Sequence, residues 1–521
     1  MDKLIGVAGL VVACQMFAVQ LSAQAKVTLP GVDEKVHGSF FSVPATVPET
    51  HGVSVGCRKL GRRLESKGWN NTTGEVQLAK GEVLFYRVCA EDSDASLKEV
   101  AAVSQLAGIF CDAKPKAVTC AGLKALSAAK NLRFAEIEPL LSCGSTRTAW
   151  VAGLPAVEVL ELGDSGFRDP KGKGGGATAV EFKAMLGLKK LRVLRMPRGE
   201  CADAEAAKAL GNLKTLEELQ IMRGPGVPET VAAVAGLPKL QSLQLHLLLT
   251  GDLPTLAGCK NLKKLVLNDA GCDPAELASL SALKQLKHLE LHGWQAAKAT
   301  DGQYTTVFIK EYPLAGLAGL TQLETLSLHG CKSKASEFGK LSALTALTEL
   351  DLSDTAVDDV WLASLLRLKG LQVLNLQGCA KVEGSAFILM PPLVSLNLAG
   401  TSVDDDTITV LYGCKTLKSL DLSGCTKLTP KALPALGHMK ALETLSLRNV
   451  AVDDAGLKDL VKCGMLRTLD LEGAAGYTDV GLRALVDLKE LRELKGTHTN
   501  KALSRDARIE LERHCEANAK R

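Results

Sequence analysis

Residues 417–430 read LKSLDLSGCTKLTP, and the first six of them carry the pattern that decides the fold. Leu417, Leu420 and Leu422 follow the spacing Leu-x-x-Leu-x-Leu, which recurs mostly at intervals of about 22 to 26 residues. The strong copies begin at Leu216, Leu240, Leu262, Leu286, Leu323, Leu347, Leu371, Leu393, Leu417, Leu442 and Leu466. Weaker copies begin at Leu106, Leu132, Val157 and Leu191, and a truncated one at Leu491. About sixteen copies exclude chance and predict one repetitive architecture.

Each copy predicts a short strand followed by a short helix. In the strand, alternate side chains face opposite sides, so the second and third leucines point inward. Between the strands, Asp358, Asp453 and Thr478 stand where a helix N-cap is expected. One such unit cannot cover its own apolar face. Stacked units bury it against each other, at about 1.5–3 kcal/mol per fully buried leucine.

These residues resemble the leucine-rich repeat family. The run from Leu417 through Cys425 to Pro430 is similar to the cysteine-containing subtype, and the recurring Asp-x-Gly-Leu phrases resemble those of exported bacterial repeat proteins. The resemblance covers roughly residues 100–496. It implies an α/β solenoid that is curved, with a parallel sheet on the concave face and short helices on the convex face, used mainly for binding proteins.

The pattern divides the chain into four predicted parts. Residues 1–25 are predicted to be a signal peptide, and residues 26–99, which lack the repeat, an N-terminal cap or small β-containing domain. Residues 100–496 form the predicted solenoid. Residues 497–521 contain a polar helical stretch, Asn500 to Asn518, which is predicted to cap the far end.

The first residues predict export. Lys3 precedes an apolar run, Leu4 to Ala13, and the small-residue pattern Ala23-Gln24-Ala25 offers a cleavage point before Lys26. The apolar run is too short for a spanning helix, and no other stretch of the sequence can cross a bilayer. A lipid anchor on Cys14 is the less favoured alternative, because the residues after Cys14 remain apolar. The expected location is secreted, periplasmic or at the cell surface.

The 15 cysteines do not predict a disulfide framework. Cys331, Cys379 and Cys425 share one repeat position, and Cys259, Cys414 and Cys463 share another. Such registers are typical of small buried residues. Outside the repeats, Cys57 and Cys89 are the one pair with the spacing and context of a bridge.

Composition and motifs narrow the function to recognition. The net charge is only +4, with no dense Lys/Arg stripe, which disfavours nucleic acid. No catalytic triad, metal-protease helix motif or dinucleotide loop occurs, so no enzyme and no cofactor is predicted. The predicted partner is another protein, with a glycan as a second option. A structural or scaffold component of an envelope or matrix is the alternative, and an enzyme or a cytosolic adaptor is disfavoured.

Two groups of strand residues are candidates for partner contact. The central outward column of the later repeats is polar and mildly acidic, although solvent-facing strand residues are commonly polar. It consists of Asp351, Asn375, Asn397, Asp421, Ser446 and Asp470. Four of the nine histidines fall on outward strand positions: His246, His288, His292 and His329.

The histidines predict a local cluster. His288, Glu290 and His292 share one face of one strand, and His329 should lie beside His292 on the next strand. Imidazoles at this spacing are compatible with a divalent metal or a pH-dependent contact, and the interpretation as ordinary polar positions stays open. No metal site is predicted, and His288, Glu290, His292 and His329 are only a weak candidate for one.

A long insertion follows this cluster. It contains Trp294, Tyr304, Phe308 and Tyr312 in a chain with only 4% aromatic residues. Aromatic side chains dominate interface hot spots, and long loops are often functional, so these four rings are predicted to contact the partner. The alternative is that the rings pack back onto the solenoid.

Overall fold

A computed structural model describes most of the chain beyond residue 91 and short segments before it. It describes residues 25–29, 39–44, 62–63, 74–78, 82–88, 92–103, 105–111, 118–137, 149–163, 176–197, 199–222, 227–268, 273–292, 296–300, 303–307, 312–331 and 333–520. The chain divides into two compact units, Met1–Leu247 and Leu248–Arg521. The predicted signal peptide, Cys14, Cys57 and Cys89 lie outside the described residues.

In the N-terminal unit, seven described strands form one parallel ladder from β5 to β11. They are β5 (Glu82–Arg87), β6 (Leu106–Cys111), β7 (Phe134–Ile137), β8 (Val159–Leu162), β9 (Val193–Arg195), β10 (Glu218–Met222) and β11 (Ser242–His246). Two antiparallel pairings precede them, β1 (Ala25–Leu29) with β4 (Gly74–Leu78), and β2 (Ser39–Pro44) with β5 and with β3 (Arg62–Arg63). Because β5 joins the ladder, parallel pairing begins before the predicted start at residue 100.

In the C-terminal unit, ten described strands form a second parallel ladder. They are β12 (Lys264–Asn268), β13 (His288–His292), β16 (Thr325–Ser327), β17 (Glu349–Asp351), β18 (Val373–Asn375), β19 (Ser395–Asn397), β20 (Ser419–Asp421), β21 (Thr444–Ser446), β22 (Thr468–Asp470) and β23 (Glu493–Lys495). The insertion after β13 forms an antiparallel hairpin of β14 (Ala296–Thr300) and β15 (Gln303–Val307).

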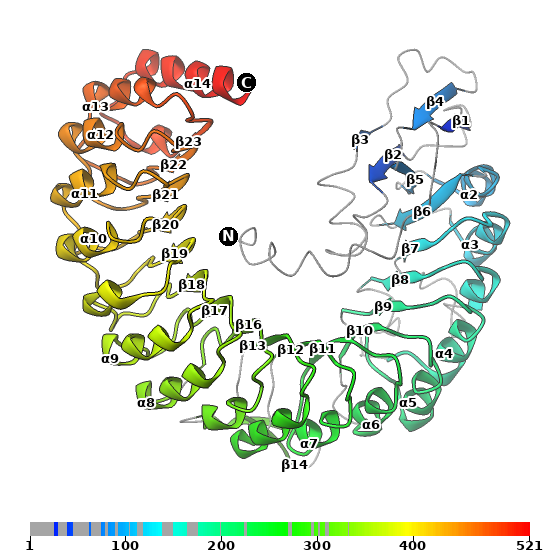
Figure 1. Cartoon of the computed structure of the whole chain (residues 1–521). Coiled ribbons are helices and arrows are strands. Elements are labelled where there is room, and N and C mark those ends of the chain that lie inside the picture. Colours follow the sequence, from blue (N-terminus) through cyan, green and yellow to red (C-terminus); the bar gives the residue numbers. More distant parts are fainter. Residues whose placement is uncertain are drawn as a thin grey trace. The chain divides into compact units, whose positions relative to one another are not determined.

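Short helices connect the strands and lie on one side of each ladder (Figure 1). The α-helices of the N-terminal unit are α2 (Asp94–Ala101), α3 (Cys120–Ala125), α4 (Ala179–Met185), α5 (Ala204–Leu210) and α6 (Glu229–Ala235). Those of the C-terminal unit are α7 (Asp252–Leu256), α8 (Ala335–Phe338), α9 (Asp359–Leu362), α10 (Asp405–Leu411), α11 (Leu433–Gly437), α12 (Asp454–Leu460), α13 (Asp479–Ala484) and α14 (Arg505–Ala519). Short 3-10 helices, such as Pro274–Ala282 and Ala363–Arg367, occupy the same side. This confirms the predicted α/β solenoid.

The leucine pattern produces a continuous core in each unit. Leu219 and Ile221 of β10 are fully buried, and their neighbours on the strand are half-buried. The first leucine of the copy, Leu216, is buried as well. Registered pairing places equivalent leucines side by side on adjacent strands, for example Leu420 opposite Leu445. The alternation of buried and half-buried residues confirms the predicted inward and outward faces.

The predicted N-caps are confirmed. The side chains of Asp358, Asp453 and Thr478 accept hydrogen bonds from backbone N–H groups in the first turns of α9, α12 and α13. At the far end, α14 buries Ala507, Leu511, Cys515 and Asn518. The predicted C-terminal cap is therefore a 15-residue helix packed on the last repeat.

A second set of acidic residues joins consecutive repeats. The carboxylate of Asp454, one residue after the N-cap of α12, accepts hydrogen bonds from Thr478 N and Thr478 Oγ1, both at 2.7 Å, and from Gly481 N at 2.9 Å. A Cβ on Gly481 would lie 2.5 Å from Asp454 Oδ1, so only glycine allows this approach. We call such a side chain a carboxylate staple; the others are Asp94, Asp359, Asp405 and Asp479.

The repeat position that holds Cys331, Cys379 and Cys425 carries Thr355 and Thr401 in the repeats between them, and hydrogen bonding accounts for this alternation. Thr355 Oγ1 donates to Leu352 O at 2.6 Å, and Cys379 Sγ of the next repeat donates to the same oxygen at 3.1 Å. Thr401 and Cys425 share Leu398 O in the same way. Burial raises the pKa of both thiols, which keeps them protonated as donors. The prediction of small buried cysteines is confirmed here, whereas Cys414 is only half-buried.

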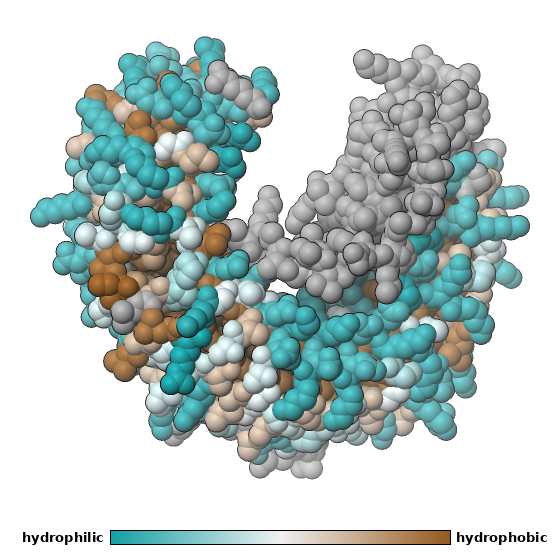
Figure 2. All heavy atoms as spheres, in the orientation of Figure 1, coloured by the Kyte–Doolittle hydropathy of each residue, from teal (hydrophilic) through white to brown (hydrophobic). Residues whose placement is uncertain are grey.

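The surface of the C-terminal unit is mixed. Apolar side chains reach solvent on its helix-bearing side, where brown atoms lie among teal ones in Figure 2. Among the described residues, the most exposed large apolar side chains of this unit are Val360 (85%) and Ile388 (72%). No helix within the described ranges is long and apolar enough to cross a membrane.

Candidate recognition surface

The histidine cluster lies on the solvent-facing side of the C-terminal ladder. β13 carries His288, Glu290 and His292 as its three half-buried residues, alternating with buried Leu289 and Leu291. Glu290 accepts hydrogen bonds from both neighbours, from His288 Nε2 and, at 2.9 Å, from His292 Nε2. One carboxylate thus orients two imidazole rings on a single strand.

The environment of Glu290 favours its charged form. Burial opposes ionisation, but the hydrogen bonds from His288 and His292 outweigh it, and Lys264 on β12 adds attraction. The net result is a pKa of Glu290 well below its ordinary value. The carboxylate is therefore a stable acceptor between the two rings.

His329 does not lie on a strand, as the sequence predicted, but in the turn that follows β16, and from there it extends the cluster to the turn after β17. Its ring centroid lies 6.2 Å from that of His292, which confirms the predicted neighbourhood. His329 Nδ1 lies 2.9 Å from Ser353 Oγ and 3.5 Å from Asp354 Oδ2. The Ser353 hydroxyl donates to Asp351 Oδ1 at 2.7 Å, so it accepts from the imidazole. The His329 side chain is 46% exposed and is available for contact.

This arrangement offers polar recognition rather than metal chemistry. Over the residues that the structure describes, no three His, Cys, Asp or Glu side chains are grouped so that they could hold a metal ion. His288 and His292 instead direct their Nε2 atoms at Glu290. The weak metal candidate considered from the sequence gains no support from the geometry of these described residues.

The acidic column of the later strands has a structural role. Asp351 Oδ1 accepts a hydrogen bond from Ser353 N at 2.9 Å, two residues further on. The same contact recurs at Asn375, Asn397, Asp421 and Asp470. Each side chain thereby holds the turn that ends its strand, which explains why Asp and Asn recur at this position. Their contact with a partner stays a prediction.

The aromatic insertion is only partly described. Trp294 and Phe308 lie outside the described residues, and Tyr304 lies on β15, in register with Ala299 of β14. Tyr312 is 1% exposed, and its carbonyl accepts a hydrogen bond from Ser333 Oγ at 2.9 Å. The prediction that Tyr312 contacts a partner is therefore wrong: the insertion has rejoined the core by this residue.

His246 belongs to the N-terminal unit. It ends β11, in register with Met222 of β10, and its Nε2 lies 3.3 Å from Gln244 Nε2. The same unit contains ion pairs that were not predicted, between neighbouring strands. They are Arg133–Glu158 (2.9 Å), Arg192–Glu217 (2.7 Å) and Arg195–Glu218 (2.7 Å). Opposite charges at equivalent repeat positions would have indicated the first two.

Comparison with known proteins agrees with the repeat geometry. A family model described as leucine-rich repeat matches residues 413–437, which contain β20 and the copy that begins at Leu417. Residues 413–437 are therefore a leucine-rich repeat, and the parallel pairings of β20 with β19 and β21 carry the same unit into the neighbouring copies. The cysteine-containing subtype stays a prediction. A search of curated proteins finds no match.

Three solved structures resemble this chain at low identity. An internalin of Listeria monocytogenes shares 17% identity with a TM-score of 0.36, covering 71% of this chain and 82% of the internalin. A leucine-rich repeat protein of Leptospira interrogans shares 16% (TM-score 0.39; 76% and 90% covered). The yeast complex of Rad7 and Elc1 provides a match at 17% (0.41; 63% and 84%). Likeness at this level says nothing about partner or activity.

Proposed function

We propose that this leucine-rich repeat protein is a recognition module that binds another protein on the solvent-facing side of its C-terminal ladder. The observation that carries the proposal is the cluster formed by His288, Glu290 and His292 on β13 together with His329, which lies in the turn after the adjacent strand β16. Rings held by a carboxylate and a hydroxyl lose little conformational entropy on binding. Side chains on strands are also positioned more accurately than side chains on loops.

The test uses the full-length protein as immobilised bait, followed by identification of the captured protein and measurement of its affinity. His292→Ala combined with His329→Ala is expected to weaken binding about tenfold or more, as truncated hot-spot residues do. His438→Ala is the matched control, because His438 is exposed on the helix side, next to Tyr412. An unchanged affinity of the double variant for the captured protein would remove the cluster from the interface.

We also propose that the protein is exported. The support is the sequence itself: Lys3, the apolar run Leu4 to Ala13 and the small-residue pattern that ends at Ala25. N-terminal sequencing of the protein isolated from its source should find Lys26 as the first residue. Protein that retains Met1 and fractionates with the cytosol would contradict export.

A further inference from the structure

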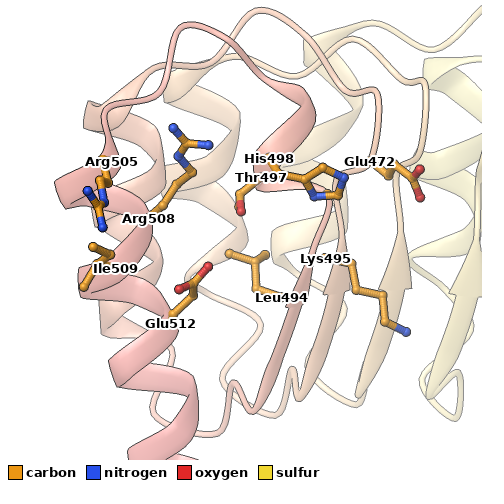
Figure 3. A pocket seen from close by; sticks show the side chains of 10 residues that line it. Glu472, Leu494, Lys495, Thr497, His498, Arg505, Arg508, Ile509 and Glu512 are labelled. Carbon is orange, nitrogen blue, oxygen red and sulfur yellow. The ribbon is translucent and has the colours of Figure 1, made fainter.

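A cavity of about 830 Å³ lies between the last strand and the capping helix. Leu494 and Lys495 of β23 line one side, and Arg505, Arg508, Ile509 and Glu512 of α14 line the other (Figure 3). It lies at the end of the ladder, apart from the histidine cluster of β13 and β16. Its lining combines an apolar floor with a charged rim.

The floor exists because the capping helix does not fully cover the last repeat. In the nine preceding strands of this unit the equivalent leucine, from Leu265 on β12 to Leu469 on β22, is at most 1% exposed. Leu494 is half-buried instead, and Ile509 facing it is half-buried too. Apolar surface left open beside charged groups is typical of binding sites.

The edge of β23 offers backbone hydrogen bonds beside this floor. Glu493 N donates to Arg467 O, and Lys495 O accepts from Leu471 N, both at 3.0 Å, so these groups face β22. In a parallel strand, alternate residues bond to opposite sides, which turns the N–H and C=O of Leu494 toward the other edge. Among the described strands, β22 is the only one that pairs with β23. The edge can therefore accept one more strand.

The rim is cationic where the helix faces this edge. Glu472, in the turn after β22, is paired with Arg448 at 2.6 Å, and Lys495 is paired with Glu493 at 3.2 Å. Within the lining, Arg505 and Arg508 then face one carboxylate, that of Glu512, and Arg508 also attracts the carboxylate of Asp479 outside the lining. The surplus positive charge complements a ligand that carries carboxylates.

We propose that this end cavity binds an extended acidic peptide segment of a partner protein. The segment pairs with the free edge of β23, places an apolar side chain against Leu494 and Ile509, and directs a carboxylate at Arg505 and Arg508. Backbone pairing supplies affinity, and the apolar floor and the arginines supply selectivity, as in other cases of strand addition. This site is independent of the histidine cluster.

The test is fluorescence polarisation with the full-length protein and labelled peptides. The probe is a short peptide in which glutamates alternate with valine and leucine, and the comparison peptide has lysine at every glutamate position. The acidic peptide is expected to bind at least about tenfold more tightly, and Arg505→Glu with Arg508→Glu should reverse the preference. Arg513→Glu is the matched control, because Arg513 is exposed on the same helix outside the cavity lining and should change affinity less than about twofold.

Three outcomes would overturn the proposal. The first is equal binding of acidic and basic peptides, and the second is unchanged binding by the Arg505 and Arg508 double variant. The third is self-association in sedimentation that the double variant abolishes, since a second copy would then occupy the cavity. Binding of the acidic peptide that persists when its central residue is N-methylated would refute the strand pairing specifically. His292→Ala should leave peptide binding unchanged, which separates this site from the proposed recognition surface.

Discussion

Replacing Asp454 with alanine should remove three hydrogen bonds that join two consecutive repeats. The carboxylate accepts from Thr478 N, Thr478 Oγ1 and Gly481 N at 2.7–2.9 Å. A hydrogen bond to a charged group contributes about 1.5–3 kcal/mol net when it is shielded, and less near solvent. Because Asp454 is half-buried, we expect the three together to contribute about 2–3 kcal/mol to the free energy of unfolding.

The assay is urea denaturation followed by circular dichroism, combined with hydrogen exchange of the amides of Thr478 and Gly481. Asp454→Ala should lower the unfolding midpoint and accelerate exchange at these two amides first, because stability in a repeat array depends on neighbouring repeats. Asp459→Ala is the matched control on the same helix. The side chain of Asp459 pairs only with Lys462 among the described residues, at 2.5 Å near solvent, so a cost of about 0–1 kcal/mol is expected.

The pH dependence provides a second check. Burial of Asp454 opposes ionisation, but the hydrogen bonds from Thr478 and Gly481 outweigh it and lower its pKa. A carboxylate whose pKa is lower in the folded protein stabilises it above the unfolded pKa and loses this contribution as the pH falls. The difference between wild type and Asp454→Ala should therefore shrink below about pH 4. Equal stability of the Asp454 and Asp459 variants at pH 7 would refute the staple.

Of three further predictions, one concerns the core and two concern the buried thiols. Leu362→Ala should destabilise the protein by about 2–5 kcal/mol, because Leu362 is fully buried. Val360→Ala, two residues earlier on the same helix, should cost less than about 0.5 kcal/mol, because Val360 is 85% exposed. Similar costs of the two substitutions in thermal unfolding would contradict the assigned buried and exposed faces. Burial raises the pKa of the Cys259 and Cys331 thiols to about 11. Both thiols should therefore resist iodoacetamide at pH 8 in the native protein and react after unfolding, as mapped by mass spectrometry. Labelling of the native protein would show that the thiols are accessible. These pKa values lie above the ordinary value of 9.0, so the protonated thiols contribute fully to stability below pH 9, and this contribution is lost as the pH rises towards 11. The midpoint of urea denaturation should therefore fall between pH 9 and 11. A constant midpoint would argue against buried thiols.

The ladder could be predicted because a strand has only two faces. Leu420 and Leu422 must point to the same side, and a spacing of one repeat must place the next pair beside them. The same rule brought His292 and His329 close together, since both occupy one repeat position, although His329 lies in the turn just beyond its strand. Register therefore follows from the sequence wherever the repeat length is regular.

Contacts that depend on the exact path between strands could not be predicted. The recurrence of Asp and Asn suggested an acidic track, but a turn-forming acceptor such as Asp421 requires only its own backbone two residues on. The phrase containing Asp453 and Asp454 was interpreted as an N-cap alone, because the second carboxylate contacts a repeat 24 residues away. Tyr312 was assigned to a loop since no periodicity marks where an insertion re-enters the core.

The shared carbonyl at Leu352 and again at Leu398 bears on how such a chain can change its length. Threonine supplies one hydrogen-bond donor to that oxygen, and the cysteine of the following repeat supplies the other. The complete motif therefore requires two consecutive repeats. Deleting a single repeat in this stretch would place two threonine repeats or two cysteine repeats next to each other. One carbonyl oxygen would then receive too many hydrogen-bond donors, or one donor would lack its acceptor. Duplication or loss of two repeats at a time preserves these shared-carbonyl hydrogen bonds. The natural step for lengthening or shortening this part of the molecule, in evolution or in design, is thus a doublet.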